Sequence, residues 1–68
     1  MTTFIRLTDP SGNPALVAVE EIIFMTKDLS TGKTMIVLSG YDQEMEVQED
    51  KALIVAAIAK AGYNVITP

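Results

Sequence analysis

Polar and apolar residues alternate most cleanly over residues 43–48, a pattern typical of a β-strand with one buried face. Met45 and Val47 fall on one side of this segment, and Glu44 and Glu46 fall on the other. We therefore predict a half-buried strand whose Met45 and Val47 side chains face the core.

Residues 3–8 and 34–39 are rich in β-branched and aromatic side chains and are also predicted to be strands. Ile5 and Leu7 share one face of the first segment. The second is apolar on both faces, which is typical of a central strand. Loops rich in Gly, Pro, Asn, Asp and Ser are expected at 9–14 and 28–33.

Residues 15–19 and 22–27 are interpreted as two more strands, separated by a kink or short turn at Glu20 and Glu21. The alternative is one helix over Leu16–Met25, since Ala, Leu, Glu and Met favour helices. Strands are preferred because five residues here are β-branched or aromatic. They are Val17, Val19, Ile22, Ile23 and Phe24.

The pairing of the last two strands depends on the length of the turn at residues 40–42. A three-residue loop pairs Val37 with Met45 and Met35 with Val47. A two-residue loop flips this register, and the sequence leaves both arrangements open.

A helix is predicted over Glu49–Ala61. Glu49 and Asp50 are placed in its first turn and Lys60 in its last turn, where each charge favours the helix dipole. Gly62 suits the position after the helix end. Residues 64–67 are expected to form a short final strand or a tail.

The predicted fold is a single α+β domain over residues 1–68. It combines a small antiparallel sheet of four or five strands, as a meander or partly open barrel, with one C-terminal helix. A chain of 68 residues buries only about 60% of its unfolded surface, so its stability margin is small.

The predicted helix has no polar residue over positions 52–59, unlike a surface helix with one apolar stripe. One side is expected to lie on the sheet of its own chain and another on a second copy. The alternative is an alanine-rich helix whose small side chains tolerate exposure. The expected interface residues are Leu53, Ile54, Val55, Ile58 and Ala61.

The composition supports self-association. The sequence is 49% hydrophobic and has no Cys and no His, so a disulfide and the commonest structural zinc ligands are both absent. Small domains usually need such a staple or an oligomeric partner. We therefore expect a homo-oligomer, with a dimer favoured and another protein partner possible.

The same composition narrows the function classes. Ser/His and Cys/His nucleophile pairs cannot be built without His or Cys, so the chain is predicted to be no enzyme and to need no cofactor. A net charge of −4 with five scattered basic residues disfavours nucleic acid. No apolar run is long enough to span a membrane, no signal peptide is evident, and a cytoplasmic location is expected.

Asp42, Glu44 and Glu46 form the only acidic series with a regular spacing. They are weak candidates for a Mg²⁺ or Ca²⁺ site, which would make a small cation-dependent enzyme the alternative function. Carboxylates along one strand point in parallel and do not converge, so a solvated strand face is the preferred interpretation.

The order of elements resembles the small FlbD-type accessory proteins of bacterial flagellar and swarming systems. The similar residues are Ile5-Arg6-Leu7, Gly12, Val19-Glu20-Glu21-Ile22, residues 34–40 and residues 47–50 leading into the helix. The resemblance implies a short β-meander followed by a helix and a non-enzymatic accessory or regulatory role. The chain departs from the family at Asp50, where Ser or Thr is expected, and in its longer loop at 9–14 and its extension over 62–68.

The same order is also similar to the carbon-storage-regulator type of RNA-binding dimer. That resemblance makes a nucleic-acid-binding regulator a further alternative. In that family a basic residue near the valine-led segment before the helix helps to grip RNA, whereas Glu49 stands near the matching place here. This reversed charge argues against RNA binding while leaving the fold likeness intact.

Overall fold

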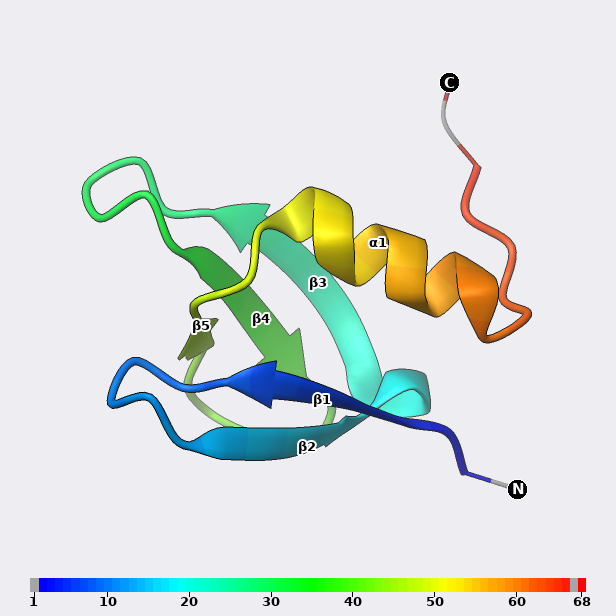
Figure 1. Cartoon of the computed structure of the whole chain (residues 1–68), viewed down its shortest axis with the longest axis horizontal. Coiled ribbons are helices and arrows are strands. Elements are labelled where there is room, and N and C mark those ends of the chain that lie inside the picture. Colours follow the sequence, from blue (N-terminus) through cyan, green and yellow to red (C-terminus); the bar gives the residue numbers. More distant parts are fainter. Residues whose placement is uncertain (1, 67) are drawn as a thin grey trace.

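The computed structural model describes residues 2–66 and 68, and over these residues it is an α+β domain of five antiparallel strands and one C-terminal helix (Figure 1). The elements are β1 (Phe4–Thr8), β2 (Pro14–Ala18), a 3-10 turn η1 (Val19–Glu21), β3 (Ile22–Lys27), β4 (Thr34–Leu38), β5 (Met45–Val47) and α1 (Lys51–Lys60). The predicted fold class is confirmed. The strands form two small sheets, β1-β2 and β3-β4-β5, and no closed barrel within the described residues.

The segment 15–27 forms strands, as predicted, and the helix alternative for Leu16–Met25 is wrong. β2 pairs with β1, and β3 pairs with β4. Between them η1 turns the chain, and the Ser39 N–H donates to the carbonyl of Glu21 at 2.7 Å. Each of the two strands thus pairs with one neighbour, and the pleated backbone suits the β-branched residues of this segment.

The register between β4 and β5 is shifted by one residue from the pairing expected for a three-residue loop. Ile36 pairs with Met45 and Met35 with Glu46, so the pairing expected for a three-residue loop is wrong. Ile36 and Val47 are both fully buried. A slip of one residue would turn one of them away from the core, and this burial fixes the register.

The core lies between the two sheets and α1, with β4 in the centre of its sheet as predicted. Ile5 and Leu7 face it from β1, which confirms their expected side. The buried apolar side chains are Ile5, Leu7, Val17, Val19, Ile36, Val47 and Ile54. Burial of one such side chain contributes roughly 1.5–3 kcal/mol, so this small set dominates the stability of the domain.

The helix is shorter than the predicted span of 49–61. Asp50 occupies the N-cap position with an extended backbone, and Glu49 precedes the helix. The prediction that both residues lie in the first turn is therefore wrong. Glu49 lies outside the helix, where its carboxylate accepts hydrogen bonds from Thr8. Lys60 in the last turn is confirmed, and Gly62 follows the helix with φ of 101°.

The described residues after Tyr63 run as a tail without strand pairing. Tyr63 itself is half-buried and packs against the core. Of the segment predicted as a strand or tail, Asn64–Ile66 is thus a tail, while Thr67 lies outside the described residues.

Candidate functional site

The five predicted interface residues on the helix do not share one outer face. Ile54 is 1% exposed and belongs to the core of its own chain, and Ile58 packs against that core. Val55 is half-buried. Leu53, at 63% exposed, and Ala61 face solvent. The large apolar side chains that suggested a helix interface are therefore mostly covered within the chain.

The acidic series does not converge. Asp42 and Glu44 are exposed in the loop between β4 and β5, while Glu46 lies on β5 and accepts a hydrogen bond from the Thr31 hydroxyl at 3.3 Å. Over residues 2–66 and 68, no group of three acidic side chains is arranged to hold a metal ion. Asp42 and Glu44 are solvated in a loop, and only Glu46 lies on a strand, so the preferred interpretation of one solvated strand face is wrong for the first two residues.

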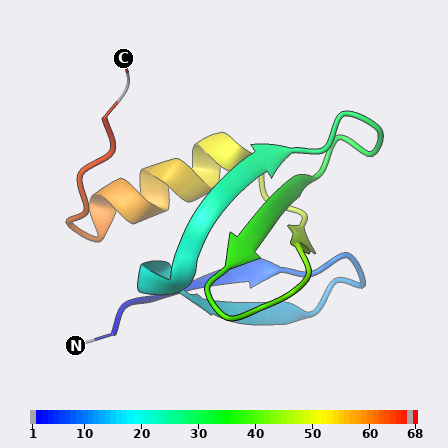
Figure 2. The same ribbon diagram turned by 180° about the vertical axis from the view of Figure 1, so that it is seen from behind.

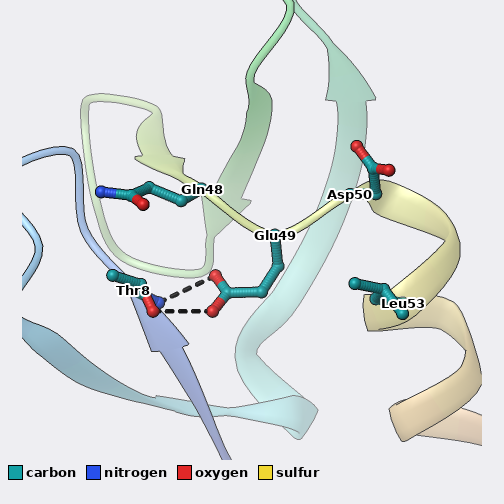
Figure 3. Close-up of a pocket in the computed structure, with 5 residues that line it drawn as sticks. All are labelled: Thr8, Gln48, Glu49, Asp50 and Leu53. Atoms are coloured by element: carbon teal, nitrogen blue, oxygen red, sulfur yellow. Dashed lines mark hydrogen bonds between the residues drawn. The ribbon is translucent and has the colours of Figure 1, made fainter.

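A hollow of about 350 Å³ lies where β1 meets the start of α1 (Figure 3). It is lined by Thr8, Gln48, Glu49, Asp50 and Leu53. The Glu49 carboxylate turns toward Thr8 and accepts from its backbone N–H and its hydroxyl, both at 2.8 Å. Both carboxylate oxygens of Glu49 are thus engaged by Thr8 within the chain.

The contacts around Glu49 join three parts of the fold. The buried Thr34 hydroxyl donates to the Glu49 carbonyl at 2.7 Å, and the Gln48 N–H donates to the Thr8 carbonyl at 2.8 Å. Partial burial alone would raise the pKa of Glu49, but the hydrogen bonds from Thr8 outweigh it and the pKa is lowered. The hydrogen bonds beside this hollow therefore fix the position of residues 48 and 49, which lead into α1.

A second set of hydrogen bonds connects the residues after the helix end to η1. The Tyr63 hydroxyl donates to the Glu20 carboxylate, which also accepts from the Thr3 N–H at 3.1 Å. The hydrogen bond from Tyr63 lowers the pKa of Glu20, and the same bond raises the pKa of Tyr63. No periodic pattern predicts this pair, because 43 positions separate its members.

An apolar groove of about 350 Å³ runs between β2 and the loop that joins β4 to β5. It is lined by Leu16, Leu38, Tyr41, Gln43, Glu44 and Met45. Its lining is mostly apolar and includes one carboxylate, that of Glu44.

The side of the β3-β4-β5 sheet that faces away from the core is a surface that the sequence analysis did not predict. Ile36 and Thr34 point into the core, so Met35 and Val37 between them point outward. Phe24 pairs with Val37 and therefore lies on the same side. We call this surface the outer sheet face and define it by Ile23, Phe24, Thr26, Met35, Val37 and Glu46.

Ile23 joins this face because of a β-bulge. The register between β3 and β4 shifts between Ile22 and Phe24, which leaves Ile23 without a partner. Ile23 is 67% exposed and Phe24 is 59% exposed, although regular alternation would bury one of two consecutive residues. Figure 2 shows this side of β3 and β4 from outside, with no other segment in front of it.

The structure is that of a small α+β domain with exposed apolar side chains on both sheets and two sets of hydrogen bonds that hold the ends of α1. Comparisons with protein-family models, with curated proteins and with solved structures found no match. Within the part of the chain that the structure describes, no helix combines the length and the apolar character needed to cross a membrane.

Proposed function

We propose that this chain is a non-enzymatic interaction module that acts as a homodimer. The supporting observation is the exposure of large apolar side chains on a surface that is extensive for the mass of the chain. A compact monomer of 7.4 kDa is expected to expose about 4,200 Å². The chain exposes 5014 Å², about 800 Å² more, and this excess includes its loops and C-terminal tail as well as the two sheets.

The kind of surface exposed supports the same proposal. Large apolar side chains stand at least half exposed on both sheets, at Phe4, Leu16, Ile23 and Phe24. Apolar patches of this kind on a small soluble domain mark sites of association. The resemblance to FlbD-type proteins, which implies an accessory or regulatory role, agrees with a binding function rather than a catalytic one.

The alternatives have less support. A cation-dependent enzyme would need Asp42, Glu44 and Glu46 to converge, and they lie apart between a loop and a strand. A nucleic-acid regulator would need basic residues near the helix start, where Glu49 instead turns its carboxylate onto Thr8.

Light scattering on the purified chain, over a concentration series from low to high micromolar, tests the proposal. We expect a mass that rises to twice 7.4 kDa and then stays constant. A constant mass of one chain across the series would overturn the dimer and direct the search to a different protein as the partner.

A further inference from the structure

We infer that two copies of this chain pair through the outer sheet face, back to back. The inference rests on the proposed function, because it names the surface that the dimer would use. It replaces the helix, whose large apolar residues are mostly covered, as the expected site of self-association.

The apolar residues of this face form one continuous patch. Phe24 and Val37 are direct cross-strand partners, and Thr26 pairs with Met35 on the same side. Cross-strand partners have Cβ atoms about 4.5–5.5 Å apart, so these side chains are neighbours on one face of the two strands. Ile23 extends the patch along β3 through the bulge.

A second copy fits this patch better than a charged partner does. The centre of the face is apolar, and its one carboxylate, Glu46, lies on the edge strand β5, where Thr31 donates to it. Two copies related by a two-fold axis would therefore bring apolar centres together and keep both carboxylates at the rim. Two sheets packed in this way lie about 10 Å apart with interlocking side chains.

The extent of surface is consistent with a partner on this face. The chain exposes about 800 Å² more than a compact monomer of its mass, and the exposed side chains of Ile23 and Phe24 contribute to this excess. Two other exposed apolar positions are less suitable. Leu53 has only the small Ala56 and Ala57 one turn further along α1, and Leu16 borders a groove that also contains Glu44.

Three matched substitutions on the full chain test the inference. Phe24→Asp, Leu16→Asp and Leu53→Asp place the same charge at side chains that are 59%, 69% and 63% exposed, on three different surfaces. Sedimentation velocity over a dilution series gives the dissociation constant of each dimer. We expect Phe24→Asp to raise it at least about thirtyfold, as for an aromatic residue central to an interface. The other two should leave it within about threefold of wild type, as expected for substitutions away from an interface.

Two further measurements guard against a variant that fails to fold. Ile23→Lys probes the same face from a position that is 67% exposed, and circular dichroism checks the fold of every variant. In the wild-type chain, the methyl NMR signals of Met35 and Val37 should shift on dilution, whereas those of Leu53 should not.

The outcomes separate the inference from the proposed function. A wild-type chain that is monomeric throughout overturns both. A wild-type dimer that is weakened only by Leu16→Asp or Leu53→Asp, with static Met35 and Val37 signals, overturns the outer sheet face and leaves the dimer in place.

Discussion

Helix α1 has no polar residue from Ala52 to Ala59, whereas the outer sheet face includes Thr26 and Glu46 among its apolar side chains. The β-branched side chains of the helix are nevertheless better covered than those at the start of β3. Ile54 and Ile58 pack on the chain's own core, while Ile23 and Phe24 on the sheet remain more than half exposed. Apolar composition alone therefore does not identify the surface that is open to a partner.

Anchoring explains the difference between the two regions. The helix is tied at its start by the bond between Glu49 and Thr8, and near its end by the bond between Tyr63 and Glu20. Both ties hold α1 against the rest of the fold. No described element lies over the outer sheet face.

The largest expected effect comes from Ile54→Ala. This truncation of a fully buried side chain should cost about 2–5 kcal/mol of the free energy of unfolding. A domain of this size has roughly 3–10 kcal/mol in total, so the variant should be close to unfolded. Urea denaturation at one fixed protein concentration measures the loss.

Leu53→Ala is the matched control on the same helix. Leu53 is mostly exposed, so its truncation should cost less than about 1 kcal/mol. Equal losses for the two variants would contradict the claim that the fold covers one side of α1 and leaves the other open.

Thr34→Val and Thr26→Val test which side of the β3-β4-β5 sheet faces the core. The Thr34 side chain is 3% exposed and donates to the Glu49 carbonyl, so the nearly isosteric valine leaves a partly buried acceptor without its donor. We expect a loss of about 1–3 kcal/mol in the free energy of unfolding. Thr26→Val makes the same chemical change on the outer sheet face and should change stability by less than about 0.5 kcal/mol. A larger loss from Thr26→Val would mean that the two sides are assigned the wrong way round.

Much of the fold could be predicted from local patterns. Alternation placed Ile5, Leu7 and Val47 correctly, and the signals at Lys60 and Gly62 located the helix end. These features depend on residues near one another in sequence, where periodicity and capping chemistry act directly.

What could not be predicted depends on contacts between distant segments. Thr8 and Glu49 are 41 positions apart, and their bond draws Glu49 out of the predicted first turn. The bulge at Ile23 likewise depends on pairing with β4. The apolar character of residues 34–39 on both faces was a usable signal for the outer sheet face, although it was interpreted only as a central position.

Glu49→Gln tests the tie at the helix start through its pH dependence. Hydrogen bonds from Thr8 lower the pKa of Glu49 in the folded chain below its usual value of 4.5. A lowered folded pKa stabilises the fold above the unfolded pKa, and this contribution is lost as pH falls through the folded value. The wild-type chain should therefore exceed the variant in stability at pH 7, and the gap should shrink below about pH 4.5.

Urea denaturation at a series of pH values measures this gap. Glu44→Gln removes an exposed loop carboxylate and serves as the control for loss of one negative charge. A gap between wild type and Glu49→Gln that stays constant from pH 7 to pH 3 would contradict the role of the Thr8 hydrogen bonds.

The tie at the helix end should give the smallest effect on stability, because Tyr63 and Glu20 meet at the surface. Its signature is the ionisation of the phenol. The hydrogen bond to Glu20 raises the pKa of Tyr63 above its usual value of 10.0.

In a Tyr41→Phe background, which leaves Tyr63 as the one phenol of the sequence, Glu20→Gln should lower the midpoint of the ultraviolet titration. Glu21→Gln removes the same charge from the neighbouring residue but keeps the acceptor, and should leave the midpoint nearly unchanged. Equal shifts from the two variants would assign the effect to net charge, and the helix end would then lack the specific tie that sets it apart from the outer sheet face.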